Sequence, residues 1–285
     1  MKKYNEIVGM EHTCVAYGTF DSVHRGHLKI ARELAAQAKR KGLTSVLVSL
    51  NGGDKALTTE QEKEYFFKDT GIDVLIFIEE RVVDAKKLIE TLGAEVLVIG
   101  ENHKELSAVK DAAKAAGAEV LVCKAEQEKG RIITTKLVRE AFDACDFRKA
   151  ELLCGHPYIM IGKVVHGKAL GRTVGMPTAN LEISGSKLEP PSGVYAASVI
   201  IEDEQYKAMT NIGKRPSVDD FDYVTIEAFI LDFSRDIYGK KLILELYTFV
   251  RGVKKFESLE DVQKQVQKDI RTVREVLGGK GGALG

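Results

Sequence analysis

Residues 18–27 read Gly18-Thr19-Phe20-Asp21-Ser22-Val23-His24-Arg25-Gly26-His27, and they decide the fold of the first half of the chain. The apolar run at 13–18 predicts a buried strand, and the apolar spacing over 24–41 predicts a helix that ends at Gly42. A strand that passes through a glycine directly into a helix is typical of α/β domains, in which this turn lies at the carboxyl end of a parallel sheet.

Outward from this stretch, apolar runs and amphipathic segments alternate through the first half. The runs are nearly continuous in Val, Ile and Leu, as expected where helices cover both faces of a parallel sheet. Predicted strands lie at 13–18, 45–50, 74–78, 95–99 and 119–123, and predicted helices at 24–41, 59–70, 84–92, 106–116, 135–144 and 146–153. The pattern predicts a doubly wound α/β domain with its ligand outside the carboxyl ends of the strands.

The pattern changes at Gly155, His156 and Pro157, beyond which strands are separated by Gly, Pro, Asp and Ser clusters. Predicted strands lie at 158–166, 193–202, 205–212, 223–232 and 241–251, and one amphipathic helix at 259–277 follows the N-cap candidate Ser258. This half is predicted to be a small antiparallel β-barrel with a C-terminal helix. We therefore expect two domains, 1–155 and 156–285.

Composition excludes several classes of protein. The 42 basic residues balance the 42 acidic ones, so no global field attracts nucleic acid or an anionic membrane. No run approaches the roughly 18 apolar residues that span a bilayer, and the first residues lack the apolar core of a signal peptide. The cysteines have no C-x-x-C spacing, which is typical of reduced thiols. We expect a cytoplasmic protein without nucleic-acid or membrane partners, and the sequence leaves its oligomeric state open.

His24 and His27 lie three residues apart at the start of the first helix. A helix N-terminus offers unpaired N–H groups to a phosphate, and two imidazoles there can donate hydrogen bonds to charge that builds on an α-phosphate. A helix-capping turn with two surface histidines is the alternative. The residues that precede the pair favour a nucleotide site, with catalytic roles for the histidines and nucleotide-binding roles for Gly18, Thr19, Phe20 and Asp21.

The same stretch resembles the signature of the nucleotidylyltransferase superfamily, whose members transfer a nucleoside monophosphate from a triphosphate to an acceptor phosphate. The resemblance implies a Rossmann-like domain with a second phosphate-binding element at the start of its last helix. Thr134 and Thr135 lie at the matching place, with Arg139 one turn later. Hydroxyls at a helix N-terminus followed by a cation suit a triphosphate tail, so these three residues are predicted to bind nucleotide.

The second half has no P-loop motif. It has instead a glycine-rich run at 162–172, followed by Pro177-Thr178-Ala179-Asn180. Glycines there would let the backbone approach phosphates. Thr178 and Asn180, two residues apart on an extended segment, project to one side. Their oxygen atoms suit a Mg²⁺ ion that bridges nucleotide phosphates, although the pattern alone is also compatible with a simple turn.

The strand predicted at 223–232 supplies a candidate base. Glu227 lies on the face opposite the apolar residues Val224, Ile226, Ala228 and Ile230. Its own neighbours on that strand face include Phe229. A carboxylate that apolar neighbours solvate poorly is a better proton acceptor, which makes Glu227 a candidate general base, although surface glutamates on strands are common.

These motifs, together with Asn211 and Arg251, resemble riboflavin kinase over about 156–275. Joined to the first half, they make the chain similar to the bacterial family of bifunctional riboflavin kinase/FMN adenylyltransferases, or FAD synthetases. The resemblance implies that Thr178 and Asn180 bind Mg-ATP, that Glu227 is the catalytic base, and that Asn211 and Arg251 lie near the flavin. It also implies nucleotide-binding roles for Gly162, Lys163, Gly171, Arg172 and Pro177.

The first half departs from the family pattern at three places. A T-F-x-P-H-P segment after the second strand is missing, residues 100–106 keep only the glycine of an aromatic G-x-D-F-x-F-G element, and S-S-T-R becomes Thr134-Thr135-Lys136. Three functions stay open. The chain makes FMN and then FAD from riboflavin and two ATP, it is a riboflavin kinase with a weak, differently specific or structural first domain, or it is a flavin-binding regulator. Retention of the kinase motif residues disfavours the regulator.

Overall fold

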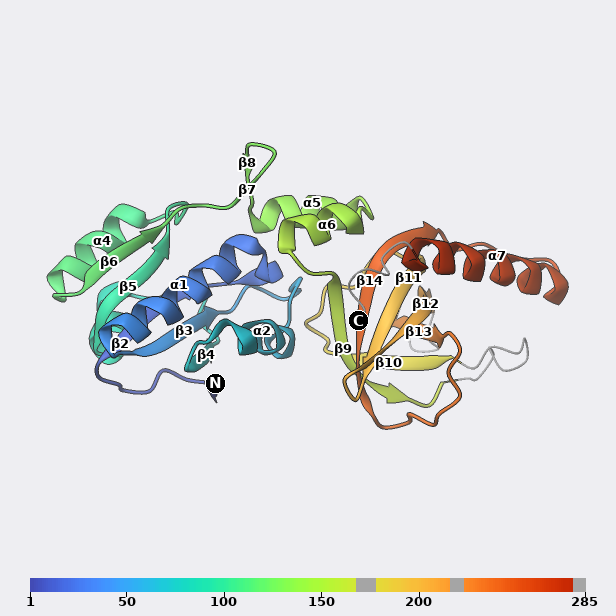
Figure 1. Cartoon of the computed structure of the whole chain (residues 1–285), viewed down its shortest axis with the longest axis horizontal. Coiled ribbons are helices and arrows are strands. Elements are labelled where there is room, and N and C mark those ends of the chain that lie inside the picture. The colour runs from blue at the N-terminus through green and yellow to red at the C-terminus, as the bar shows by residue number, and fades with distance from the viewer. Residues whose placement is uncertain (168–177, 216–222, 279–285) are drawn as a thin grey trace. The chain divides into compact units, whose positions relative to one another are not determined.

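The computed structural model describes residues 1–167, 178–215 and 223–278. The chain divides into two compact units, Met1–Val138 with Leu153–Gly155, and Arg139–Leu152 with His156–Gly285. The doubly wound α/β fold and the antiparallel barrel with its C-terminal helix are both confirmed (Figure 1). The domain boundary after residue 155 stays a prediction, and the division into units places the helical residues 139–152 with the barrel.

A six-stranded parallel sheet in the order β1-β4-β3-β2-β5-β6 forms the centre of the first unit. Its strands are β1 (Lys2–Tyr4), β2 (Thr13–Gly18), β3 (Thr44–Leu50), β4 (Val74–Ile78), β5 (Ala94–Gly100) and β6 (Glu119–Cys123). Strand β2 pairs with β3 on one side and with β5 on the other, so the strand order reverses there. In open α/β sheets the ligand binds at this switch point, beyond the carboxyl ends of the strands.

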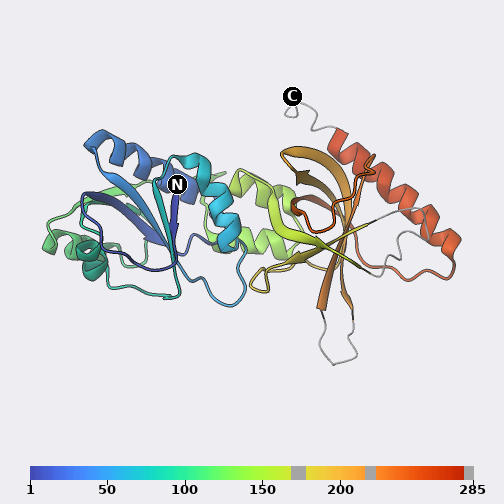
Figure 2. The same cartoon turned by 90° about the horizontal axis from the view of Figure 1, so that it is seen from below.

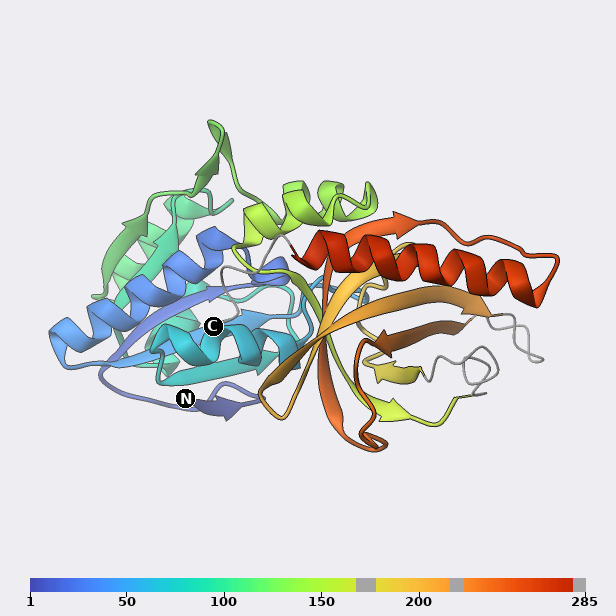
Figure 3. The same cartoon turned by 45° about the vertical axis from the view of Figure 1, so that its right-hand side comes forward.

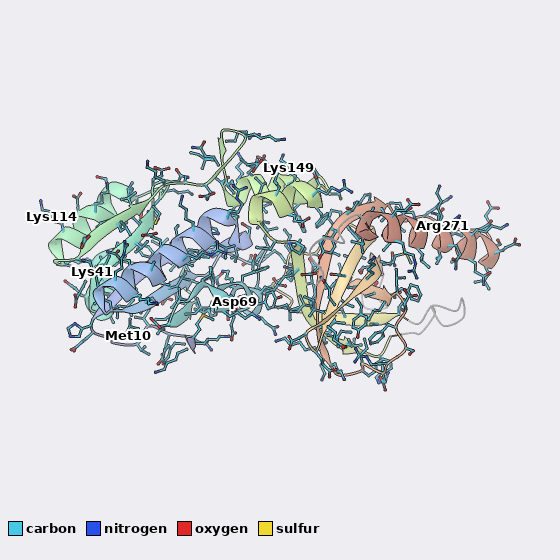
Figure 4. The ribbon with its side chains drawn as sticks, in the orientation of Figure 1. Met10, Lys41, Asp69, Lys114, Lys149 and Arg271 are labelled. Carbon is cyan, nitrogen blue, oxygen red and sulfur yellow. The ribbon has the colours of Figure 1, made fainter. Side chains whose placement is uncertain are left out.

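Helices cover both faces of this sheet (Figure 2). The helices are α1 (Arg25–Lys41), α2 (Glu60–Phe67), α3 (Ala85–Thr91) and α4 (Leu106–Ala115), with 3-10 turns η1 (Asp21–Val23) and η2 (Lys68–Thr70). Successive strand residues alternate between the faces: Ala16 packs with α1 and α2, whereas Val15 packs with α3 and α4. Lys41, in the last turn of α1, forms an ion pair with Glu119 of β6 (Figure 4). Burial on both faces explains why the strands read as continuous apolar runs.

A short hairpin that the sequence did not predict follows β6. It consists of β7 (Gln127–Glu128) and β8 (Arg131–Ile132). Arg25 of α1 donates hydrogen bonds to Glu128 at 2.9 Å and Glu126 at 3.4 Å, and Lys29 pairs with Glu126 at 2.9 Å. These ion pairs hold the hairpin to the start of α1.

Six antiparallel strands close the barrel of the second unit in the order β10-β13-β12-β11-β14-β9. They are β9 (Tyr158–Val165), β10 (Ala179–Ile183), β11 (Gly193–Ile201), β12 (Glu204–Arg215), β13 (Tyr223–Ile230) and β14 (Lys241–Arg251). The helices α5 (Thr135–Asp143) and α6 (Phe147–Cys154) precede the barrel, and Phe147 contacts the buried Tyr195 ring edge to face at 5.3 Å. The unpredicted strand β10 completes the closure because it pairs with both β9 and β13.

The C-terminal helix α7 (Leu259–Gly278) packs against the outside of β11, β12 and β14 (Figure 3). Val273 and Leu277 of α7 pack on Val194 and Ala196 of the barrel wall. Ser258 accepts a hydrogen bond from the Asp261 N–H, so the expected N-cap is present. In the part of the chain that the structure describes, none of the helices has the length and apolar content needed to cross a lipid bilayer.

Candidate active sites

The turn between β2 and α1 has a strained backbone. Phe20, Ser22 and Val23 have φ angles of 45°, 69° and 38°. The left-handed region costs about 1–2 kcal/mol for a residue with a Cβ atom, and a β-branched side chain rarely adopts it. Such a conformation persists only when surrounding contacts determine it, and residues in it cluster at functional sites.

Contacts from two distant segments hold this turn. The Asp21 carboxylate accepts hydrogen bonds from the N–H groups of Ser22 and Thr58, each at 3.1 Å. The Thr135 hydroxyl donates to the Asp21 carbonyl at 3.0 Å. The start of α5 therefore meets the β2–α1 turn, which brings together the two nucleotide elements that the sequence predicted. Asp21 itself is buried, and its side chain braces the turn.

The two histidines of the turn form a stacked pair. Their ring centroids are 3.7 Å apart with the planes 15° from parallel. His24 caps α1, because its Nδ1 accepts a hydrogen bond from the His27 N–H at 3.3 Å. The buried His27 Nδ1 has no hydrogen-bond partner among the described residues. Burial, followed by the neighbouring His24 and Lys63, lowers the pKa of His27 well below its ordinary value, so its ring is neutral near pH 7.

A cavity of about 560 Å³ lies at the switch point of the sheet. Its volume is in the range of small-molecule sites. It reaches from the ends of β2 and β5 to the start of α5, and the predicted residues that line it are Gly18, Thr19, Phe20, His24, His27, Thr134 and Thr135. Among the described residues, Asp21 and Arg139 do not belong to its lining. The cavity thus unites seven of the nine residues predicted for this half.

An aromatic pair that sequence reasoning missed also lines this cavity. Tyr17 and His103 both line it and contact edge to face, with their ring centroids 5.6 Å apart. Burial, followed by the charge of Glu105, raises the pKa of Tyr17 to about 12, so the phenol keeps its proton. The His103 Nδ1 accepts a hydrogen bond from the Glu105 N–H at 3.2 Å. The cavity therefore has an aromatic lining even though the family's aromatic element is missing from residues 100–106.

In the barrel, strand register places three predicted site residues in one row. Asn180 of β10 lies directly opposite Glu227 of β13, and Glu227 lies directly opposite Asn211 of β12. Opposite residues of an antiparallel pair project from the same face, with Cβ atoms about 4.5–5.5 Å apart. Phe229, two residues further along β13, packs in the cluster beneath α7, so the row lies on the outer face of the barrel.

Two further features fix the surroundings of Asn180. A Cβ atom added to Gly167 would come within 2.1 Å of the Asn180 Nδ2, so only glycine leaves room for this carboxamide. Thr178 lines a second cavity, of about 360 Å³, which Phe233, Arg235 and Tyr238 close on another side. Among the described residues, the lining of this cavity includes neither Asn180 nor Glu227, so the structure groups Asn180 with Glu227 but places Thr178 in a separate hollow.

Three other predicted residues of the second unit lie in the described part of the chain. Arg251 donates to the buried Asp269 of α7 at 2.8 Å, which ties the end of β14 to the C-terminal helix. Gly162 and Lys163 lie in β9, where a Cβ atom on the glycine would come within 2.3 Å of the Glu182 carbonyl oxygen. The predicted residues Gly171, Arg172 and Pro177 lie outside the described residues.

Among the described residues, no group of three or more His, Cys, Asp or Glu side chains could hold a metal ion. A cation at Thr178 and Asn180 would be held by neutral oxygen atoms and by a bound ligand. This donor set fits Mg²⁺, which usually keeps waters and binds substrate phosphates.

Comparison with known proteins finds a matching family for each half of the chain. A family model described as FAD synthetase matches residues 8–136, and one described as riboflavin kinase matches residues 154–277. A crystal structure of a macrolide-efflux protein from Streptococcus pneumoniae matches with a TM-score of 0.83 and 26% identity, covering 95% of this chain and 98% of that one.

Curated bifunctional enzymes match nearly the whole chain. The bifunctional riboflavin kinase/FMN adenylyltransferase of Bacillus subtilis is 30% identical over 284 residues, which cover 90% of this chain and 89% of that protein. The Haemophilus influenzae enzyme of the same name is 29% identical over 292 residues, with 93% and 94% coverage. The chain therefore belongs to the family of bifunctional riboflavin kinase/FMN adenylyltransferases.

Proposed function

We propose that this chain phosphorylates riboflavin to FMN with ATP in its second unit and converts FMN to FAD with a second ATP in its first. One observation carries the proposal: each unit has its own site, one around the His24–His27 pair and one along the row that contains Glu227. Both family models match, one in each half. The presence of candidate site residues in both units favours the bifunctional enzyme over a kinase with a structural first domain.

In the kinase reaction, the riboflavin 5′-hydroxyl oxygen attacks the γ-phosphorus of ATP. A new P–O bond forms, the bond to the β-phosphate oxygen breaks, and ADP leaves. Glu227 accepts the hydroxyl proton, which contributes about 10²–10⁴-fold to such a reaction. Thr178 and Asn180 hold the nucleotide, together with a Mg²⁺ ion that neutralises phosphate charge when bound. Lys163, and the glycine and arginine residues of 162–172, support the phosphates, and Asn211 and Arg251 contact the flavin.

In the adenylyltransferase reaction, a phosphate oxygen of FMN attacks the α-phosphorus of ATP, and pyrophosphate leaves as the bond to the β-phosphate breaks. His24 and His27 donate hydrogen bonds to the charge on the α-phosphate. Gly18 and Thr19 let the triphosphate approach the start of α1, and Thr134 and Thr135 bind its tail with the help of Arg139. The flavin ring lies against the aromatic pair of Tyr17 and His103.

The substrates are small molecules, and nothing in this chemistry needs a nucleic-acid or membrane partner. We place the protein in the cytoplasm, where the four free cysteines stay reduced. We also place the domain boundary after residue 155, so that the helical residues 139–152 lie between the two catalytic regions in the sequence.

Product analysis tests the proposal. The purified protein is incubated with riboflavin, ATP and Mg²⁺, and the flavins and nucleotides are separated by chromatography over time. We expect FMN first and FAD later, with ADP formed in the first step and pyrophosphate in the second. A parallel reaction starts from FMN and ATP. FMN that accumulates without any FAD would reduce the function to riboflavin kinase. No turnover of riboflavin would remove the kinase activity, and no FAD from added FMN would remove the adenylyltransferase activity.

A further inference from the structure

A buried lysine lies directly beneath the strained turn of the first unit. Lys63, on α2, is only 5% exposed. Its ammonium group donates hydrogen bonds to the Thr19 carbonyl at 2.7 Å and to the Ser49 hydroxyl of β3 at 3.0 Å. Thr19 lines the nucleotide cavity on its other side. Lys63 therefore supports the cavity wall from behind.

A buried ammonium is costly unless it is paired. In the described part of the chain, no carboxylate forms an ion pair with Lys63. The titratable groups around it are Asp21 of the turn, Glu60 of its own helix and His27 of α1, while β3 contributes only the neutral Ser49. Burial lowers the pKa of Lys63 to about 8, and the two acidic groups oppose this effect. The charged form of Lys63 therefore lowers the stability of the folded protein.

Helix α2 does not need this charge in order to pack. Thr59 and Glu62 form a reciprocal capping box at its start, and Phe67 is fully buried in the core near its end. An unbranched apolar side chain could fill the same space. The property that an apolar side chain lacks is the donor that holds the Thr19 carbonyl in a turn where Phe20 and Ser22 have left-handed conformations.

We propose that Lys63 is a positioning residue of adenylyl transfer, whose ammonium fixes the Thr19 carbonyl and so shapes the β2–α1 turn around the nucleotide. This inference rests on the proposed function of the first unit. The same ammonium stands close enough to His27 to disfavour a second positive charge, and so helps to keep that ring neutral beside the nucleotide. Lys63 itself touches no reacting atom.

The test compares three variants of the full chain. Lys63→Met removes the charge and keeps an unbranched side chain, and Lys63→Arg keeps the charge. Lys68→Met is the matched control, because Lys68 directly follows α2 and is exposed. For Lys63→Met we expect the kcat of FAD formation to fall about tenfold or more, since hydrogen bonds from charged groups are among the strong ones. The KM for FMN and the rate of riboflavin phosphorylation should stay within about twofold.

The pH profile separates positioning by the charge from a purely structural role. Wild-type FAD formation should decline as the pH rises past the pKa of Lys63, because the deprotonated amine holds the Thr19 carbonyl less strongly. Lys63→Arg should regain part of the lost rate and keep it to higher pH, since a guanidinium does not titrate there. Lys63→Met should lack the alkaline decline, and riboflavin phosphorylation should not show it in any variant.

Amide hydrogen exchange gives a readout that does not depend on FAD synthesis. The amides of residues 18–22 should exchange faster in Lys63→Met than in Lys68→Met, with exchange in the barrel unchanged. If the wild type makes no FAD, the proposed function fails, and this exchange difference alone decides whether Lys63 braces the turn. Equal exchange in the two variants, or an unchanged rate and pH profile in Lys63→Met, would overturn the inference.

Discussion

Replacing Glu227 by glutamine tests the kinase half most directly. The variant keeps the size of the side chain and its place in the row with Asn180 and Asn211, and it removes the negative charge together with the ability to accept a proton. Loss of a general base lowers a rate by about 10²–10⁴-fold, so the barrier should rise by at least about 2.7 kcal/mol. Because Glu227 is half-buried on a barrel wall and glutamine fills the same space, stability should change by only about 0.5 kcal/mol.

The assay is the initial rate of FMN formation at saturating riboflavin and Mg-ATP. Glu182→Gln serves as the control, because Glu182 lies two residues from Asn180 on β10 and loses the same charge while it is exposed. FAD formation from added FMN should be unchanged in both variants. A Glu227→Gln enzyme that phosphorylates riboflavin within about threefold of wild type would refute the role of the carboxylate as base.

Three further predictions follow from contacts of the described residues. Asp269→Ala should destabilise the second unit by about 2–3 kcal/mol, because it leaves the Arg251 guanidinium without its ion-pair partner. Urea unfolding monitored by loss of kinase activity measures this change, and an unchanged unfolding midpoint would contradict it. Gly167→Ala should raise the kinase KM for Mg-ATP about tenfold, because the new methyl group displaces the Asn180 carboxamide, with FAD formation from FMN as the unaffected comparison. The stability of the first unit should rise between pH 8 and 10.5, because the unfolded chain binds a proton at Lys63 that the folded one has released. In urea unfolding, Lys63→Met should remove this part of the pH dependence. If the free energy of unfolding rises with pH equally in the wild type and in Lys63→Met, Lys63 is not the group that causes the rise.

Local patterns predicted the long buried strands but not the short strands β1 and β10. The apolar runs of β2 to β6 indicate burial on both faces, and a run of that kind has few alternatives to a central strand. Strand β1, by contrast, is Lys2–Tyr4, and its extended form depends on the edge of β4. Strand β10 alternates polar residues such as Asn180 and Glu182, and its two partners are distant in sequence. A strand whose extended form depends on its partner therefore has no clear pattern in its own sequence.

The candidate site of the first unit was also predicted only in part. The motif around His24 predicted the position of the cavity, since a strand, a glycine and a helix N-terminus are consecutive in sequence. Lys63 was missed because it lies within Glu60-Gln61-Glu62-Lys63-Glu64, which looks like a solvated helix face until α2 is packed beneath the turn. Tyr17 was missed because a tyrosine in a strand first indicates a core position. The roles of the predicted residues stay predictions that the variants above test.

The row Asn180–Glu227–Asn211 has a consequence for how the barrel tolerates change. Side chains alternate between the two faces of a strand, so a slip of β13 by one residue would turn Glu227 into the barrel interior and Ile226 outward. We expect such a slip to cost the kinase activity, because Glu227 would no longer share a face with Asn180 and Asn211. We therefore expect the recovery of riboflavin phosphorylation during refolding to report the correct alignment of β13.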